Sequence, residues 1–294
     1  MRRIFVLGML IAVGSVSVAT FGLQQPQAPK VIEVEKLKDN LFLLKGGGGN
    51  TAVFVGANGV TVVDAKNPGW GQPILDKIKE LTPRPVVRLI NTHTHGDHVS
   101  GNVEFAAAVE VVAQENTKAN MEKMEIFKTS GGRGLPKQTF KDKLTIGSGP
   151  EQIDLYYFGR GHTNGDTFVV FTALRVAHAG DIFSGKNLPL IDTANGGSVM
   201  AISDSLQKAH AGIKNVDSVI TGHSTVMPWA DLAEYSAFNK DVVAWAQAQK
   251  KAGKTAEQAA AEFKAPEKYK GYSSTMGALM GGLPGHVQRI YDGS

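Results

Sequence analysis

The segment NTHTHGDHVSG, Asn91 to Gly101, places three histidines and an aspartate within six positions. Imidazoles titrate near neutral pH, so protonated rings held this close together would repel one another. A bound divalent cation removes that repulsion because it takes the place of the protons. Neutral imidazoles and a carboxylate are also a ligand set that suits zinc. Three of the eight histidines of the chain fall in this segment, which favours a metal site over a polar loop with chance histidines.

Backbone geometry explains how these side chains can converge. On a helix, His93 and His95 would point about 200° apart, whereas in an extended segment residues two apart share one face. The preceding run, Val86–Ile90, is strand-like, so both histidines are expected to project from the end of a strand. Gly96 is expected to allow a sharp turn that brings the next two residues in from a neighbouring direction. Two adjacent ligand positions are therefore predicted.

Three further candidate ligands stand where a predicted strand meets a loop. They are His162 after residues 155–158, Asp181 after 175–179 and His223 after 216–220. A glycine lies directly before each of them, which lets a side chain approach a crowded centre. One such residue would be weak evidence, but three at the ends of three strands indicate the remainder of one metal site.

The rest of the chain predicts two strand-rich halves that are each followed by helices. Strands are predicted at 31–37, 41–45, 51–55, 59–64, 85–90, 105–112, 143–146, 152–158, 167–171, 174–179 and 216–220. Helices are predicted at 73–81, 118–127, 203–213, from residue 231 and at 256–263, the last two with capping boxes at Asp231/Glu234 and Thr255/Gln258. This order favours a layered α/β sandwich with mixed sheets. The polar, glycine-rich tail from Lys264 is left unassigned.

The N-terminus has the pattern of a cleaved signal peptide over residues 1–19, with a cationic start, an apolar run and small residues before the cleavage point. A flexible leader, 20–30, a catalytic domain, 31–230, and a C-terminal helical segment with a tail, 231–294, are expected to follow. The expected location is periplasmic or secreted, with no stable membrane anchor after cleavage. The chain has no cysteine and a formal net charge of only +4, which gives no basis for disulfides or for binding nucleic acid.

The histidine and aspartate pattern resembles the signature of the metallo-β-lactamase superfamily, H-x-H-x-D-H followed by H, D and H. The resemblance runs from about Leu41 to Ser224 and implies a four-layer αββα sandwich with two divalent metal ions, zinc first, with iron or manganese as alternatives. By this resemblance, the first metal would be held by His93, His95 and His162, and the second by Asp97, His98 and His223. Asp181 would bridge the two metals, and Asp64 would support the ligands from behind, with a turn-capping aspartate as the alternative.

The resemblance implies a hydrolase that cleaves an ester-like or amide-like bond in a small molecule of the β-lactam, lactone or thioester class. Asp97 would pass a proton to the leaving group. An aspartate at position 181 is similar to glyoxalase II and lactonases, whereas GRGHTNGDTFVVF (159–171) and NLPLIDTANGGS (187–198) resemble exported bacterial members. The alternative is a diiron redox enzyme on the same fold. Those enzymes tend to carry glutamate where this chain has His95, which disfavours that alternative.

Five other residues allow two interpretations that only a structure can separate. His178 is expected to be a satisfied core histidine, with metal support as the alternative. Trp70 could line the mouth of the site or pack on the surface, and Arg133 could bind a substrate carboxylate or remain in solvent. Asn164 and Asp166 are expected to order the loop of His162. The substrate-binding residues and the oligomeric state are not predicted.

Overall fold

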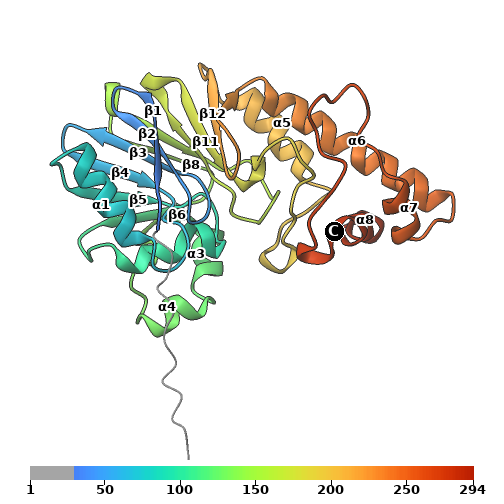
Figure 1. Ribbon diagram of the computed structural model, residues 1–294, viewed down its shortest axis with the longest axis horizontal. Coiled ribbons are helices and arrows are strands. Elements are labelled where there is room, and N and C mark those ends of the chain that lie inside the picture. Colours follow the sequence, from blue (N-terminus) through green and yellow to red (C-terminus); the bar gives the residue numbers. More distant parts are fainter. Residues whose placement is uncertain (1–29) are drawn as a thin grey trace, which may run out of the picture.

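The computed structural model describes residues 30–294, so the predicted signal peptide and all but the last residue of the leader lie outside the described residues. Two mixed β-sheets form the centre of the molecule (Figure 1). In the described part of the chain, no helix is both long enough and apolar enough to cross a membrane.

The first sheet is built almost entirely from the N-terminal half of the chain. Its strands, in spatial order, are β1 (Glu33–Lys38), β2 (Leu41–Lys45), β3 (Thr51–Gly56), β4 (Gly59–Val63), β5 (Val86–Ile90), β6 (Glu110–Gln114) and β7 (Gln138–Phe140). Strands β1 to β4 pair antiparallel, and β4 to β7 pair parallel. The parallel part places the carboxyl ends of β4 and β5 at one edge of the sheet.

The second sheet follows along the chain. Its spatial order is β13 (Met227–Pro228), β12 (Ser218–Thr221), β11 (Val176–Gly180), β10 (Phe168–Phe171), β9 (Ile153–Tyr156) and β8 (Lys143–Ile146). All neighbours pair antiparallel except β11 and β12, which are parallel. The carboxyl ends of β11 and β12 therefore point the same way.

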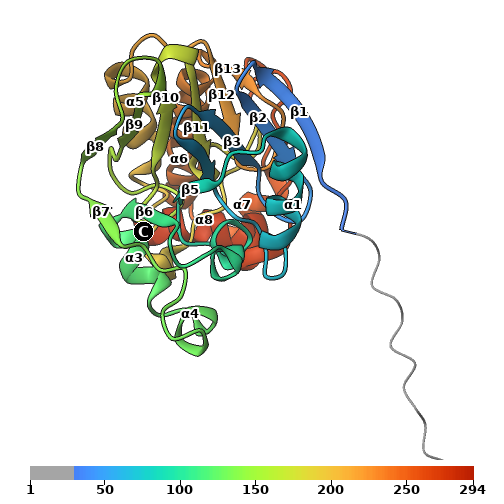
Figure 2. The same ribbon diagram turned by 90° about the vertical axis from the view of Figure 1, so that its left-hand side faces the viewer.

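Helix α1 (Gly71–Leu81) covers the outer face of the first sheet, and α5 (Ile202–Gly212) and α6 (Asp231–Lys251) cover that of the second. The other helices are α2 (Gly96–Val99), α3 (Glu115–Met121), α4 (Glu125–Thr129), α7 (Ala256–Glu262) and α8 (Gly282–Asp292). Figure 2 shows α5 beside the second sheet and α1 beside the first, with the two sheets between them. The predicted four-layer αββα sandwich is confirmed.

Side-chain alternation along the strands explains these layers. In β3, Ala52 and Phe54 belong to the core between the sheets, whereas Val53 belongs to the core beneath α1. In β10, Val169 faces the same inter-sheet core, and Phe168 faces the third core beneath α5 and α6. Because each central strand is apolar on both faces, each sheet must pack against the other sheet on its inner face and against helices on its outer face.

Three local predictions were wrong in detail, and the sequence leaves one segment unassigned. The strand predicted at 105–112 begins only at Glu110, and the helix predicted at 118–127 is split into α3 and α4. The capping box at the start of α6 does not form, because Ala230 is the N-cap and Asp231 is already the first residue of the helix; Asp231 and Glu234 pair with Lys186. The box of Thr255 and Gln258 is present. The unassigned tail contains α8, which contacts α6 and α7.

Candidate metal centre

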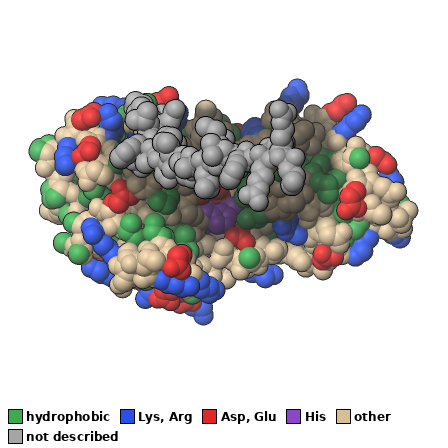
Figure 3. Space-filling view, turned by 60° about the horizontal axis from the view of Figure 1, so that its bottom comes forward, with side chains coloured by type: hydrophobic (Ala, Val, Ile, Leu, Met, Phe, Trp, Pro, Cys, Tyr) green, Lys and Arg blue, Asp and Glu red, His purple; other side chains and the backbone are tan. Residues whose placement is uncertain are grey.

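All seven predicted ligands lie at one edge of the sandwich. His93 and His95 follow β5, and Asp97 and His98 lie on α2. The other three come from the second sheet: His162 lies between β9 and β10, Asp181 follows β11 and His223 follows β12. Figure 3 shows histidine side chains at the bottom of a hollow in the molecular surface. The parallel pairs β4–β5 and β11–β12 thus bring distant segments to one point.

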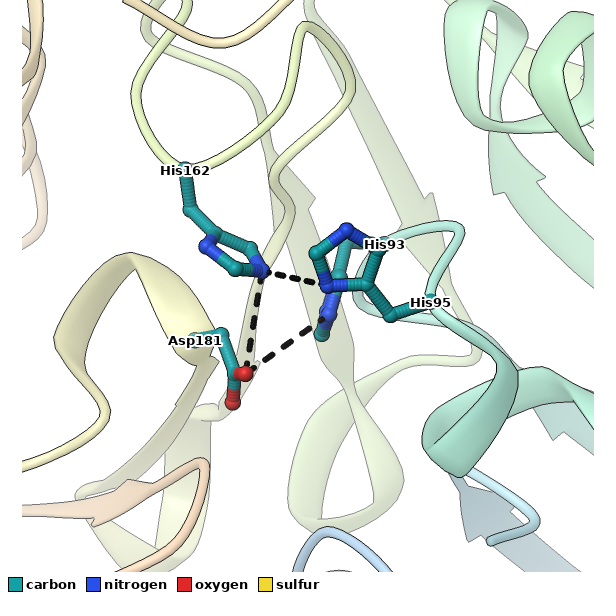
Figure 4. Close-up of side chains that lie close together, drawn as sticks. All are labelled: His93, His95, His162 and Asp181. Atoms are coloured by element: carbon teal, nitrogen blue, oxygen red, sulfur yellow. Dashed lines mark hydrogen bonds and ion pairs between the residues drawn. The ribbon is translucent and has the colours of Figure 1, made fainter. Parts of the chain in front are cut away.

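The first group of candidate ligands contains four side chains. Figure 4 shows His93, His95, His162 and Asp181 pointing toward one another. One ligand atom from each lies within 4.8 Å of the others. His162 Nε2 is 2.8 Å from His95 Nδ1 and 3.6 Å from Asp181 Oδ2, which in turn is 4.0 Å from His93 Nε2.

The second group lies directly beside the first. Asp97, His98 and His223 also offer ligand atoms within 4.8 Å of one another. His223 Nε2 is 3.2 Å from Asp97 Oδ2 and also 3.2 Å from Asp181 Oδ2. His98 Nε2 is 3.3 Å from Asp181 Oδ1. Both oxygens of Asp181 therefore lie between the groups, in the position that a bridging carboxylate would need.

Hydrogen bonds on the outer side of the rings determine which nitrogen of His95 and of His162 is free. His95 Nε2 lies 2.8 Å from a carboxylate oxygen of Asp192, and His162 Nδ1 lies 2.6 Å from the carbonyl oxygen of Leu190. Because both partners are acceptors, these nitrogens carry the protons. The remaining nitrogens, His95 Nδ1 and His162 Nε2, therefore face each other with lone pairs.

The same reasoning applies to His93 and His98. His98 Nδ1 donates to Asp64 Oδ2 at 2.7 Å. The Thr92 hydroxyl donates to the same oxygen of Asp64, so it accepts from His93 Nδ1 at 3.0 Å. His93 Nε2 and His98 Nε2 are left with lone pairs that point inward, and His93 Nε2 is buried without a hydrogen-bond partner. Three of these inward nitrogens belong to the first group and one to the second, and together they are lone-pair donors that bound cations could satisfy.

Asp64 lies close enough to His93 and His98 to form a third possible group of ligands. Its two carboxylate oxygens are already used, however, because Oδ1 accepts from the Thr92 amide and Oδ2 from the Thr92 hydroxyl and His98. Asp64 is fully buried and has a positive φ of 65° at the end of β4. These contacts orient His98 directly and His93 through Thr92, and they leave Asp64 without a free oxygen for a metal ion.

The electrostatic environment separates the histidines into two kinds. Burial lowers the pKa of His93 well below its usual value, and burial together with His95 lowers the pKa of His162 to about 4. Hydrogen bonds to Asp181 and Asp97 raise the pKa of His223 to about 9. For His98, burial would lower the pKa, but Asp181 and Asp64 outweigh it and raise the pKa well above its usual value. Protons and a metal therefore compete for the second group.

Glycines are required where the ligands meet. A Cβ atom on Gly222 would lie 1.8 Å from Asp181 Oδ1, and one on Gly180 would lie 2.5 Å from Thr92 Oγ1. Gly180 also has a φ of 57°, which other residues rarely adopt. Gly96, by contrast, does not make the sharp turn that was predicted, because it is the first residue of α2 and has no positive φ. Asp97 and His98 are brought in by a turn of helix.

Three supporting groups were not predicted from the sequence. Asp192 binds His95, Thr92 links His93 to Asp64, and the Leu190 carbonyl binds His162. Thr92 could have been found, because it lies between the ligands in the opening segment. Asp192 and the Leu190 carbonyl belong to the segment NLPLIDTANGGS (187–198), whose resemblance to other family members did not reveal their roles, and only the path of this loop past the site does.

The other residues that the sequence analysis considered either support the loops around the site or lie away from it. His178 is a satisfied core histidine, bonded to the Asn50 carbonyl and the Gly180 amide. Asp166 binds the amide and the hydroxyl of Thr163, and the Asn164 side chain accepts from Asn120, so both order the His162 loop as predicted. Two more were left open by the sequence: Trp70 packs against the core beneath α1, and Arg133 donates to the Phe105 carbonyl.

The fold and the site define an αββα sandwich with a His/Asp cluster at one edge that can hold metal. Residues 44–223 match the family model of the Metallo-beta-lactamase superfamily. The chain belongs to this superfamily, and it is a hydrolase of the superfamily's metal-dependent type.

Two relatives show how far the similarity extends in sequence. A metallo-beta-lactamase type 2 from Elizabethkingia meningoseptica is 24% identical over 235 residues, which cover 76% of this chain and 88% of that protein. A hydroxyacylglutathione hydrolase from Nostoc punctiforme is 29% identical over 163 residues, or 54% of each chain. The match to this second relative thus spans about half of its length.

Two solved structures share the fold. A metallo-beta-lactamase from Pontibacter korlensis has a TM-score of 0.60 at 20% identity and covers 71% of this chain and 99% of its own. The stereoselective inverting sec-alkylsulfatase Pisa1 from Pseudomonas sp. has a TM-score of 0.70 at 14% identity, and the match covers 89% of this chain but 50% of the sulfatase.

Proposed function

We propose that this chain is a hydrolase with two divalent metal ions, zinc first, that cleaves an ester-like or amide-like acyl bond in a small molecule. The observation that carries this proposal is the convergence of ring nitrogens whose protons are held on the outer side by Asp192, Leu190, Thr92 and Asp64. This arrangement orients the rings so that one nitrogen of each faces the place where a cation would bind. His93, His95 and His162 would hold one ion, Asp97, His98 and His223 the other, and Asp181 both.

When bound, two such ions lower the pKa of water and polarise a substrate carbonyl. In the proposed reaction, water adds its oxygen to the acyl carbon, the bond to the leaving oxygen, sulfur or nitrogen breaks, and the leaving atom takes up a proton. The chain's contribution is to fix the geometry, because the candidate ligands come from α2 and from segments that follow β5, β9, β11 and β12, and four of the histidines are held by an outer hydrogen bond.

Asp97 is the side chain that we propose to carry the proton. Its Oδ2 lies 3.2 Å from His223 Nε2 and 3.7 Å from His98 Nε2, and the carboxylate is partly exposed toward the hollow. A carboxylate that reaches both the metal ligands and the open side can meet a leaving group there. The relatives named as a metallo-beta-lactamase and as hydroxyacylglutathione hydrolases support hydrolysis, and they leave the acyl class to experiment.

The test combines metal analysis with a substrate screen. Purified protein should contain two divalent ions per chain and should hydrolyse at least one of a β-lactam, a lactone, a thioester or an aryl ester. Dialysis against a strong chelator should abolish turnover, and added zinc should restore it. His95→Ala should remove activity and reduce metal content, whereas the control His210→Ala, on α5, should keep both. Turnover that survives both the chelator and His95→Ala would refute the proposal, as would oxygen uptake by an iron-loaded protein without hydrolysis.

A further inference from the structure

A cavity of about 490 Å³ opens over the candidate metal centre. One side consists of ligand side chains, among them Asp97, Asp181 and His223. The opposite side comes from two segments outside the H-x-H-x-D-H motif: the loop that carries Leu188 and Leu190, and the C-terminal residues 275–279. We call the second segment the C-terminal strap, residues 273–281, which joins the end of the α7 region to α8. It lies outside the part of the chain that matches the superfamily.

The strap is fixed at its beginning. The Ser273 amide donates to the Lys186 carbonyl at 3.1 Å. The Lys186 ammonium lies 3.3 Å from Asp231 and 3.2 Å from Glu234, both in the first turn of α6, and 5.7 Å from the ring centre of Tyr272. These contacts connect the strap, the Leu188 loop and α6. The strap therefore stands over the cavity because of its attachment to the rest of the fold.

The strap and the loop present apolar side chains to the cavity. Leu188 is buried, Leu190 and Met276 are half-buried, and Leu279 is 72% exposed. An exposed leucine alone needs no explanation, but four apolar side chains around one cavity form a surface that a ligand can cover. The Gly277 backbone between Met276 and Leu279 has no atom within 4 Å of the place where a Cβ would stand, so the strap has room to adjust.

Away from the candidate ligands, the described residues that line the cavity include no basic side chain that could bind a negative charge on the substrate's acyl group. Neither lysine nor arginine is among these described residues. Lys186 is the basic residue of the adjoining loop, but Asp231 and Glu234 hold its ammonium away from the cavity. Only neutral polar groups, Ser184, Asn187 and Thr275, accompany the ligands and the apolar side chains.

We propose that the C-terminal strap and the Leu188 loop select substrates with an extended, uncharged apolar acyl group, which lies between Leu190 on one side and Met276 and Leu279 on the other. This inference rests on the proposed function for the reacting centre. It adds the substrate class, and it assigns specificity to a segment that lies outside the superfamily match.

The test uses binding of the carboxylic acids that such a reaction would release, so that it does not depend on turnover. Calorimetry on the zinc-loaded protein should show the Kd falling by about tenfold or more from butanoate to octanoate, because each added methylene covers apolar surface. Octanedioate, which has the same length and a second charge, should bind at least about tenfold more weakly than octanoate. Equal affinities along the series, or tighter binding of the dianion, would overturn the inference.

Variants of the strap test whether its side chains cause the dependence of binding on chain length. Met276→Ser and Leu279→Ser should each flatten the chain-length series to less than about threefold while zinc content stays at the wild-type value. Met200→Ser, a control at a partly exposed methionine outside the cavity, should leave the series unchanged. A series that persists in both strap variants would overturn the inference. A protein that binds octanoate in this way but hydrolyses no acyl substrate would refute the proposed function instead.

Discussion

His95 Nδ1 and His162 Nε2 lie 2.8 Å apart, although the other ring nitrogen of each already donates to an oxygen of Asp192 or Leu190. Two nitrogen lone pairs at this distance repel, and a metal ion bound beside both of them would relieve that repulsion. The outer hydrogen bonds therefore determine the chemistry of the inner nitrogens. Metal affinity should depend on residues that never touch the metal.

Asp192→Ala should weaken binding of the first metal by about 10- to 100-fold, because His95 loses the partner that fixes its tautomer. Asp192→Asn should retain most of the affinity, since its amide oxygen still accepts a proton. Asp192 also binds Asn195, so Asn195→Ala separates support of the loop from support of His95. Competition with a chelator measures the affinities. Wild-type affinity in Asp192→Ala would contradict the role given to this carboxylate.

Gly222→Ala should disrupt the centre, because the new methyl group would lie 1.8 Å from Asp181 Oδ1. The carboxylate must move, and a displacement of about 1 Å at a reacting centre costs about 100-fold in rate. We expect loss of at least one metal ion, measured by elemental analysis, and a fall in turnover of that size. Gly277→Ala, where the methyl group meets nothing within 4 Å, should keep full metal content. Two bound ions in Gly222→Ala would show that Asp181 does not need its observed position.

His286, on α8, should make the fold sensitive to acid. Burial, with a smaller contribution from Arg289, lowers the pKa of His286 to about 4, and its Nδ1 has no hydrogen-bond partner. An unfolded histidine titrates near pH 6.5, so between about pH 6.5 and 4 the unfolded state binds more protons. The free energy of unfolding should therefore fall as the pH drops through that window, by up to about 3 kcal/mol from this residue.

Urea unfolding of the metal-free protein at pH 7.5 and pH 5 tests this expectation. His286→Leu should lose less stability than the wild type between the two pH values, because leucine takes up no proton. Other histidines titrate in both proteins, so the difference between the two pH dependences belongs to His286. If the free energy of unfolding changes equally with pH in both proteins, the His286 ring is already charged or solvated in the folded protein.

Most of the strands could be predicted because their side chains alternate and glycine or asparagine ends them. The errors occurred where tertiary contacts replaced local signals. Glu234 does not form a capping box, because α6 has Ala230 at its N-cap, and the Glu234 carboxylate binds Lys186, 48 residues away. The strand before the third helix was predicted too early, since Phe105 and Val109 belong to the core beneath α1 without being part of β6.

The sequence by itself indicated the seven candidate ligands, because histidines and aspartates close to the ends of several strands form a set of metal-binding groups that chance polar loops would not supply. It also determined the layers, because strands that are apolar on both faces must be covered on both. Only the tertiary structure decided which nitrogen of each ring is free, since Asp192 and the Leu190 carbonyl reach the site across 97 and 28 residues of chain. It also placed the C-terminal strap over the cavity. Hydrogen bonds and packing between distant segments have no periodicity along the chain, so no sequence pattern records them.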